Sequence, residues 1–485
     1  MIDESLADFA LEASEKFGFD YVEAKVQRDT FISLSLKNGS SDVPVKGEIY
    51  GISMRAIYKG HLGFTSTNAL KKENIESALA SLKKSLEAVS STGLGEKVSL
   101  SEEDSLTANW TVDERVKFED ISGEDLLKKL KELDSIASSE SKIKQRILRL
   151  NGSLQEKYYV NSEGTIVKAR VPRFLFVSFL TALDSGDVAQ RFIEIGGSGG
   201  FEVLDLLKVQ EKLKEEVKTI SSIVGRRRGF KEGTYDVIVG PEISGIMAHE
   251  SIGHPFEADR VFGREGAQGG ESYLKESNIV KIGSQEAFIS DDPTIPYSYG
   301  YFLFDEEGVK ARKKELVKNG YVNELLHNRE TAGLLGIKSN ASARASNFSV
   351  EPIIRMSNTY VEPGDWSFEE MLKEVKDGIL IKSFMEWNID DRRLNQRYVG
   401  YEAYLISNHE VKEPVKNVII ETTTINLWSK LYARSRDLEF TAATCGKGDP
   451  EQGVPVWTGG PYMLFKGLSL KGRENGLRGD GKEGY

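Results

Sequence analysis

The chain lacks several features that would mark it as secreted or membrane-bound. It has one cysteine in 485 residues, which excludes a disulfide framework within the chain and suits a reducing compartment. Its apolar runs fall far short of the ~20 residues that a membrane-spanning helix needs. Its start, MIDESLADFALE, has no basic region followed by an apolar block, as a signal peptide would. We therefore expect a cytoplasmic protein that does not enter a membrane.

An excess of basic charge is also missing. Lys and Arg number 64 against 75 Asp and Glu, which gives a net charge of −11, and the two signs are interspersed along the chain. This balance argues against a protein that coats nucleic acid. Hydrophobic residues make up 39% of the sequence, enough for a sizeable core, and the length favours two or three domains.

Periodic patterns predict an α+β fold. Apolar residues recur every three or four positions over 2–17, 75–89, 126–136 and 206–220, as they do in amphipathic helices. Between these helices, alternating segments with Asn-Gly and Glu-Gly turns predict antiparallel strands. The polar, glycine-bearing stretch 225–233 marks a domain boundary. We predict an N-terminal α+β domain with an antiparallel sheet over 1–228, a β-rich C-terminal domain over 229–472, and a disordered tail over 473–485.

Two of the five histidines lie within six residues, in His249-Glu-Ser-Ile-Gly-His254. Gly240 and Pro241, after an apolar strand, predict the start of a helix that carries them. On a regular helix, residues five apart point about 140° away from each other, so the two imidazoles could not share one ion. A widening to i→i+5 hydrogen bonding, or unwinding at Gly253, would bring them together, and such distortions occur at functional sites. The alternative is a pair of histidines whose ring nitrogens are satisfied by hydrogen bonds.

Cys445 is the only thiol that could complete a metal site with these histidines. Two imidazoles and one thiolate are an allowed ligand set for zinc, which in catalytic sites keeps a further position open. The surrounding segment, Thr444-Cys-Gly-Lys-Gly448, is a glycine-bearing loop rather than the apolar run expected around a core cysteine. A core role, or a nucleophilic thiol with a histidine base, is the alternative. The same ligands also tolerate cobalt or iron.

Three acidic residues accompany the histidines. Glu250 follows His249 directly and could serve as a general base toward a water molecule, then pass the proton to a leaving amine. Glu257 and Asp259 come soon after His254 and could orient the imidazoles as hydrogen-bond acceptors, although a solvated acidic turn fits them equally well. Together these residues indicate metal-assisted hydrolysis of an amide bond.

At these positions the sequence resembles the TldD half of the TldD/TldE (PmbA) metalloproteases, also called modulators of DNA gyrase. The resemblance covers most of the chain, from about residue 20 to residue 470. The sequence departs from the family's glycine-rich segments at 385–393 and 421–424. Besides the histidine motif with Glu257 and Asp259, the matching segments are Asp305-Glu-Glu-Gly308, Arg355-Met-Ser-Asn-Thr-Tyr360, Pro363-Gly-Asp365 and Thr444-Cys-Gly-Lys447.

The resemblance implies a zinc metalloprotease whose catalytic domain is the β-rich 229–472. His249, His254 and Cys445 would bind one Zn²⁺ per chain, and Glu250 would be the general base. The partner would be a TldE/PmbA-like homologous subunit without the metal motif, in a heterodimer, or a second copy in a homodimer. The enclosed site would admit unfolded peptides. From the charge balance and the short apolar runs we expect neither nucleic acid nor a membrane as a partner. Because this chain keeps the whole motif, it resembles the catalytic member.

Substrate contacts are predicted from one candidate edge strand. The segment 353–360 alternates apolar and polar residues, and peptides often bind proteases by adding a strand to a sheet edge. Arg355, Asn358 and Tyr360 are therefore candidate substrate-binding residues, although an interior strand fits the pattern at least as well. Two other functions stay open. One is a non-catalytic partner or regulatory scaffold, which would not need the motif residues, and the other is a metal-dependent deacylase of small molecules.

Overall fold

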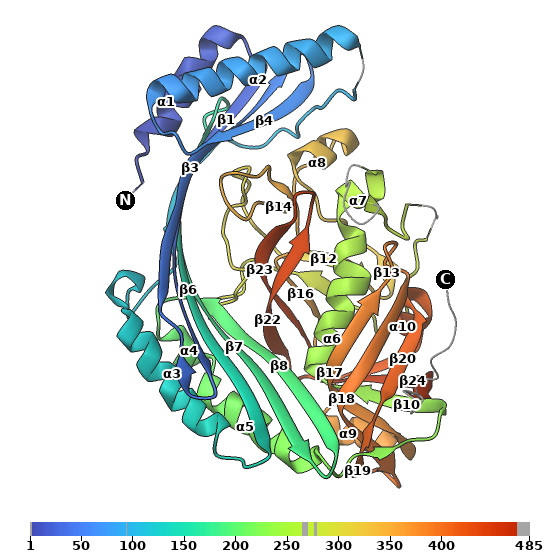
Figure 1. Cartoon of the computed structure of the whole chain (residues 1–485). Helices are drawn as coiled ribbons and strands as arrows, with labels where there is room; N and C mark the ends of the chain where they lie inside the picture. The colour runs from blue at the N-terminus through green and yellow to red at the C-terminus, as the bar shows by residue number, and fades with distance from the viewer. Residues whose placement is uncertain (1, 94, 264–269, 276–278, 473–485) are drawn as a thin grey trace, which may run out of the picture.

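The computed structural model describes residues 2–93, 95–263, 270–275 and 279–472, so the segment predicted to be a disordered tail lies outside the described residues. Its N-terminal part is a long, curved and mostly antiparallel sheet in the order β4-β3-β1-β6-β7 (Figure 1). Strands β5 and β8 both pair with β7, and β2 pairs with β1. The strands are β1 (Tyr21–Lys37), β2 (Ser40–Ser41), β3 (Val45–Tyr58), β4 (His61–Thr67), β5 (Thr107–Thr111), β6 (Ile143–Asn161), β7 (Ile166–Asp184) and β8 (Asp187–Ser198).

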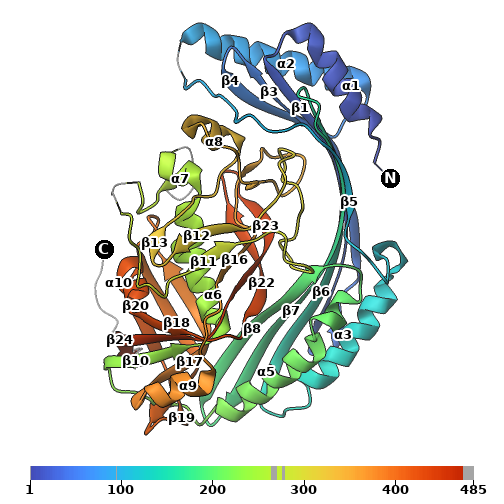
Figure 2. The same cartoon turned by 180° about the vertical axis from the view of Figure 1, so that it is seen from behind.

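Helices cover this sheet at both of its ends. One pair packs at the N-terminal end, and a second group lies along the convex face at the other end (Figure 2). The apolar spacing predicted these helices, and Leu126, Leu130 and Leu133 of one of them are fully buried against the sheet. The helices are α1 (Ser5–Ser14) and α2 (Lys72–Thr92) at the first end, and α3 (Gly123–Ala137), α4 (Val203–Leu206) and α5 (Val209–Ile223) at the second.

Two further sheets form the C-terminal part. In the larger one, β17 pairs with both β10 and β18, so that β17, β10, β24, β20 and β18 close into a ring. The second sheet has the order β13-β12-β11-β16-β23-β22, and β14 pairs with β15 in a small ribbon. The strands of the first sheet are β9 (Arg228–Gly229), β10 (Gly233–Val239), β17 (Asp377–Ile389), β18 (Asn395–Ser407), β19 (Glu410–Lys416), β20 (Val418–Thr423), β21 (Leu431–Arg434) and β24 (Met463–Gly472). The others are β11 (Ile289–Asp291), β12 (Lys314–Lys318), β13 (Tyr321–Val322), β14 (Ala343–Arg344), β15 (Ile353–Ile354), β16 (Asn358–Val361), β22 (Glu439–Lys447) and β23 (Gln452–Gly460).

The buried helix α6 (Pro241–Ala248) lies between these two sheets (Figure 1). It contacts β17 of the ring on one side and β16, β22 and β23 on the other. The α+β fold class predicted from the sequence is confirmed. The remaining helices are α7 (Ala258–Phe262), α8 (Arg329–Leu335), α9 (Phe368–Glu374) and α10 (Thr424–Ser429). Among the described residues, no helix is both long enough and apolar enough to cross a membrane.

Buried ion pairs join the N-terminal sheet to the C-terminal part. Glu306 accepts from Lys25 and Lys157, each at 2.5 Å, and Glu307 accepts from Arg55 at 2.5 Å. All of these side chains are largely buried. Because removing one member would leave an uncompensated charge in the interior, such pairs fix the relative placement of the elements that carry them.

The segment 353–360 is not one edge strand. Residues 353 and 354 form β15, and residues 358–361 form β16, which is bonded to β11 on one side and to β23 on the other. An interior strand has both rows of backbone groups occupied and cannot accept a peptide. The prediction of an interior strand is therefore correct for residues 358–361, whereas β15 belongs to a two-stranded ribbon.

Candidate active site

Helix α6 brings the histidine motif into the space between the two sheets. Pro241 occupies its first turn, as predicted, and Ile243 and Met247 are buried. Gly245 faces β23 so closely that a Cβ there would lie 2.7 Å from the backbone nitrogen of Gly459. The helix can approach the sheet only because residue 245 is glycine.

After α6 the helix widens into a π-helical turn over His249–Gly253. The backbone N–H of His254 donates to the carbonyl of His249, which is the predicted i→i+5 hydrogen bond. The two imidazole rings consequently lie with centroids 5.0 Å apart, nearly perpendicular at 82°. The widening predicted from the five-residue spacing is confirmed, and it places both rings on one side of the chain.

Three buried contacts fix the π-helical turn. The Ser251 hydroxyl donates to the Met247 carbonyl at 2.5 Å and accepts from Trp428 Nε1 at 2.9 Å. The Tyr273 hydroxyl donates to the Ser251 carbonyl at 3.0 Å. Because Trp428 and Tyr273 come from other parts of the chain, the irregular turn depends on the folded surroundings and not on local sequence alone.

Substitution of Gly253 by alanine tests how tightly this turn is packed. A Cβ at Gly253 would lie 1.9 Å from Met356 Sδ, so we expect Gly253→Ala to lower the free energy of unfolding by about 1–3 kcal/mol, as overpacking usually does. Denaturant titration measures the change. Gly253→Ala combined with Met356→Ala should lose less stability than the sum of the two single substitutions, because the two sites share one space. Gly229→Ala, where a Cβ meets nothing within 4 Å, is the matched control, and an equal loss there would contradict the packing argument.

Cys445 reaches the histidines from strand β22. Its Sγ lies 3.4 Å from His254 Nε2, and one donor atom each of His249, His254 and Cys445 lies within 4.8 Å of the others. All three residues are buried. The guanidinium of Arg355 donates to the Cys445 carbonyl and, at 2.7 Å, to the Gln452 carbonyl. Arg355 thus braces the β22–β23 hairpin beside the thiol.

The protonation chemistry of these three residues fits a zinc ion. Burial lowers the pKa of both imidazoles, which favours the neutral ring that a metal requires. Burial would raise the pKa of Cys445, but His254 and Arg355 outweigh it and lower the pKa to about 7. Among the described residues, His249 Nδ1 is buried without a hydrogen-bond partner. A neutral His/His pair with an acidic thiol is a donor set typical of zinc.

Glu257 and Asp259 occupy different positions relative to the histidines. Glu257 lies 3.1 Å from His254 Nδ1 and accepts from Arg260 at 3.0 Å and Lys447 at 3.2 Å. Burial opposes its charge, yet Lys447 and His254 hold the pKa of Glu257 well below its usual value. Asp259 instead accepts from Lys447 at 2.7 and 2.8 Å. Of the two predicted partners, the structure brings Glu257 to the imidazole and places Asp259 behind Lys447.

Glu250 forms an ion pair that the sequence did not suggest. Arg393, in the turn between β17 and β18, donates to its carboxylate at 2.6 Å. Burial raises the pKa of Glu250, and His249 and Arg393 partly oppose that rise. Arg393 holds a left-handed backbone conformation with φ of 62°. It lies 143 residues from Glu250, so no local motif could connect them, and the departure from the family pattern at 385–393 was the only available signal.

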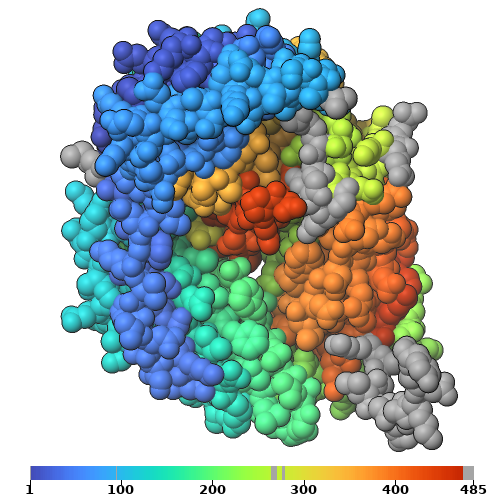
Figure 3. Space-filling view, turned by 45° about the horizontal axis from the view of Figure 1, so that its top comes forward, coloured from blue at the N-terminus to red at the C-terminus, as the bar shows by residue number. Residues whose placement is uncertain are grey.

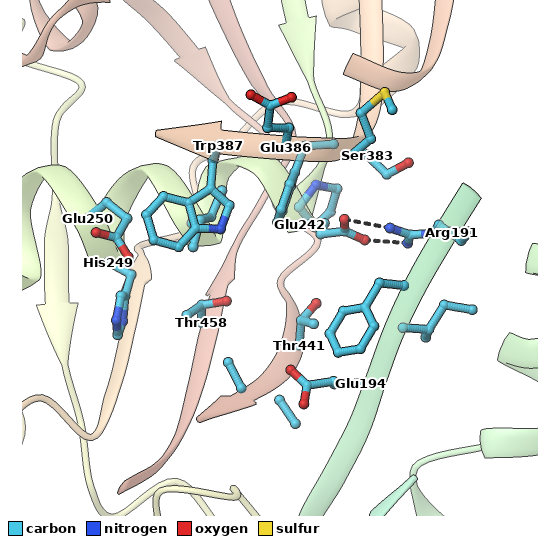
Figure 4. Close-up of a pocket in the computed structure, with 18 of the residues that line it drawn as sticks. Arg191, Glu194, Glu242, His249, Glu250, Ser383, Glu386, Trp387, Thr441 and Thr458 are labelled. Carbon is cyan, nitrogen blue, oxygen red and sulfur yellow. Dashed lines mark hydrogen bonds and ion pairs between the residues drawn. The ribbon is translucent and has the colours of Figure 1, made fainter. Parts of the chain in front are cut away.

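A cavity of about 1160 Å³ opens onto these residues. The surface is hollowed between the green strands of the N-terminal sheet and the orange strands β17 and β18 (Figure 3). Its wall includes His249, Glu250, His254, Cys445 and Arg393. Strands β8, β17 and β22 supply most of the rest, and Figure 4 shows side chains from these elements pointing into the pocket. The cluster is therefore buried against the protein on one side and accessible from the cavity on the other.

The three residues predicted to bind substrate are placed elsewhere. Arg355 is fully buried and engaged with backbone carbonyls. Asn358 is fully buried and donates to the Asp292 carbonyl at 2.7 Å. Tyr360 is 6% exposed and packs edge-on against Phe440. The described residues that line the cavity do not include Arg355, Asn358 or Tyr360.

Comparisons with known proteins agree over most of the chain. Family models of the PmbA/TldA metallopeptidases match in three parts: domain 1 over 22–88, the central domain over 116–227 and the C-terminal domain over 232–472. A protein named metalloprotease from Methanocaldococcus jannaschii is 28% identical over 91% of this chain and 95% of its own length. A protein named zinc metalloprotease TldD homolog from Saccharolobus solfataricus is 27% identical over 95% of this chain and 99% of its own. The crystal structure of TldE from Thermococcus kodakarensis has the same fold, with a TM-score of 0.76 and 19% identity over 96% of this chain and 100% of that one.

Proposed function

Because this chain belongs to the PmbA/TldD family of metallopeptidases, we propose that it is a zinc peptidase that hydrolyses peptide bonds of small or unfolded polypeptides. The observation that carries the proposal is the buried His249, His254 and Cys445 cluster beside Glu250 at the wall of a large cavity. Relatives named metalloprotease and zinc metalloprotease support the same reading. A non-catalytic scaffold would have no need for these four residues together.

In this proposal His249, His254 and Cys445 hold one Zn²⁺ per chain. When bound there, the ion would polarise the scissile carbonyl and lower the pKa of a water molecule toward about 7. Glu250 takes a proton from the attacking water and delivers it to the leaving amine nitrogen. Arg393, which already binds the Glu250 carboxylate at 2.6 Å, holds that carboxylate in one orientation at the cavity wall.

The residues around the cluster position its ligands. Glu257 accepts from His254 Nδ1 and so presents Nε2 toward Cys445. Lys447 compensates the charge of Glu257, and Arg355 fixes the backbone of Cys445. These contacts allow a precise site to form before substrate arrives, which is the condition for catalysis by orientation.

The cavity wall suits an extended peptide. β22 is the last strand of its sheet and is bonded to β23 on one side only. The other two strands at the cavity are β8, which is bonded to β7, and β17, whose residues 383–389 are bonded to β18. Each of these strands lines the cavity. A peptide that adds beside β22 would gain backbone hydrogen bonds whatever its side chains, with its carbonyls passing Cys445. The extended segments of a folded protein are mostly paired or packed within it, so unfolded chains are the substrates that we propose.

We also propose the working assembly and location. The N-terminal part, residues 1–228, supplies β8 as one cavity wall, and residues 229–472 supply the metal ligands. A subunit of the same fold, either a TldE/PmbA-like homologue or a second copy, would complete the enclosure around the cavity. The TldE structure supports this only through its shared fold. The single thiol at the metal site suits the cytoplasm, where it would stay reduced.

Substitution of Glu257 tests whether this residue positions His254. We expect Glu257→Gln to weaken zinc binding by about 10- to 100-fold, because the His254 ring loses a charged acceptor. Asp259→Asn is the matched control, since it leaves the contact between Glu257 and His254 in place. Competition with a zinc-chelating dye measures both affinities. An equal effect of the two substitutions would contradict the role given to Glu257.

Peptide digestion tests the function itself. The zinc-loaded protein, alone and with a candidate homologous subunit, is incubated with a pool of unstructured peptides and with a stably folded protein. We expect mass spectrometry to detect new peptide termini from the pool only, and chelation of zinc to stop their formation. An absence of new termini in every zinc-loaded preparation would overturn the peptidase proposal and favour the scaffold. Release of small acyl groups without peptide cleavage would favour the deacylase.

A further inference from the structure

The cavity has an acidic wall. Eleven Asp and Glu residues line it, against four Lys and Arg. An enclosed cavity lined by one sign of charge concentrates ligands of the opposite sign. Most of the buried carboxylates there already have a cation: Glu216 and Glu242 share Arg191, and Glu250 binds Arg393. These pairs are complete without a ligand.

Glu194 on strand β8 differs from these carboxylates. No hydrogen bond or ion pair to it is found within the described part of the chain, although its side chain is half-buried at the cavity wall. Figure 4 shows it projecting into the same pocket as His249 and Glu250. Burial raises the pKa of Glu194 to about 7, with no charged neighbour opposing the rise. A cation that entered the cavity would supply the missing partner.

The apolar side chains beside Glu194 indicate which kind of cation would bind there. Phe192, two residues before Glu194 and on the same face of β8, and Phe440 of β22 line the same cavity. A lysine or arginine side chain combines an apolar stem with a charged end, so it can pack against such rings while its head meets a carboxylate. A metal ion would need several ligand atoms at once, and the one such group found among the described residues, His249, His254 and Cys445, does not include Glu194.

The spacing of residues along β22 gives the distance between Glu194 and the peptide bond that would be cut. Strands β8 and β22 approach each other, and Thr441 of β22 projects into the pocket beside Glu194 (Figure 4). Thr441 and Cys445 are four residues apart on one face of the strand, which corresponds to about 13 Å. An extended peptide lying along β22 would span that distance with about four of its own residues.

We propose that Glu194 and its apolar neighbours form a subsite for one cationic, lysine- or arginine-like side chain of the peptide, about four residues from the scissile bond. The proposal rests on the proposed peptidase function for its substrate and names the chemical class that this cavity prefers. Peptides that carry acetyl-lysine, norleucine or glutamate at that position would lack the interaction, because none of them presents a positive charge to the carboxylate.

Matched peptides test the subsite by cleavage and by binding. The probes are ten-residue peptides of Gly, Ala and Ser with a single Lys moved along the sequence, and the same peptides with norleucine, acetyl-lysine or Glu. Cleavage is measured with the zinc-loaded wild type. Binding of fluorescently labelled probes is measured by anisotropy with zinc-loaded Glu250→Gln. Glu194→Gln and Glu194→Lys remove and reverse the charge, and Glu211→Gln, at an exposed position of α5, is the control.

We expect the wild type to favour Lys over norleucine by about tenfold in kcat/KM at one position only, a typical effect of one charge pair. Glu194→Gln should bring that ratio close to one, Glu194→Lys should favour the Glu peptide, and Glu211→Gln should keep the wild-type ratio. Equal rates for Lys and norleucine in the wild type, or an unchanged ratio in Glu194→Gln, would overturn the subsite. Lysine-selective binding without any cleavage would overturn the peptidase function and leave the subsite standing.

Discussion

Replacement of Glu250 by glutamine should abolish hydrolysis while zinc stays bound. Glutamine keeps the size and one oxygen of the side chain, so Arg393 can still donate to it, but it cannot take a proton from water. General-base catalysis contributes about 10²- to 10⁴-fold, and we expect kcat to fall by that factor or more. The change is measured as initial rates of peptide cleavage at saturating substrate, with zinc content determined on the same samples.

The control for Glu250→Gln is a Glu→Gln substitution at an exposed position. Glu421→Gln, at an exposed position of β20, should keep both rate and zinc content. A Glu250→Gln protein that retains most of its activity would show that Glu250 is not the base. Loss of zinc together with activity would instead show that Glu250 helps to hold the metal, and the role proposed for it would be wrong.

Replacement of Cys445 by serine should remove zinc from the site. A thiolate is a far better zinc ligand than a neutral hydroxyl, and serine has no acidic proton in this range. Since loss of a ligand's hydrogen-bond partner alone costs about 10- to 100-fold in affinity, loss of the ligand should exceed about 100-fold. Elemental analysis after dialysis measures retained zinc, and circular dichroism checks that the variant is folded.

The single cysteine makes an independent readout possible. Because the chain has only one thiol, a thiol-reactive dye reports on Cys445 alone. We expect the zinc-loaded wild type to react slowly and the chelated protein to react quickly, since a coordinated thiolate is protected. Thr444→Ser, at the neighbouring position, should behave as the wild type. Equal reactivity with and without zinc would exclude Cys445 as a ligand.

The sequence predicted the helix and allowed for its distortion, because a helix start and the spacing of two histidines are local features. Gly240 and Pro241 mark the start of α6, and histidines five residues apart can share one ion only where the helix widens or unwinds; the structure has the wider turn at His249–Gly253. The α+β class followed from hydrophobic periodicity in the same way. Cys445 could be joined to the histidines because it is the only thiol, although 191 residues separate it from His254.

Features that depend on tertiary pairing could not be predicted. Arg393 meets Glu250 only because β17 and β18 close the ring of strands beside α6. Periodicity cannot distinguish an edge strand from an interior one, so the sequence could not show that Arg355 lies buried behind Cys445 instead of facing a substrate. Glu194 is an ordinary strand glutamate in the sequence, and only the folded chain shows that it faces the cavity without a cation.

Titration of the metal-free protein with zinc tests the central claim most directly. Zinc is removed with a chelator under reducing conditions, then returned in measured steps while peptide cleavage and protein-bound zinc are followed together. We expect cleavage to be absent at first, to rise in proportion to bound zinc, and to saturate at one zinc per chain, with Cys445→Ser gaining neither zinc nor activity. Full cleavage by the zinc-free protein, or zinc bound at one per chain in Cys445→Ser, would contradict the account.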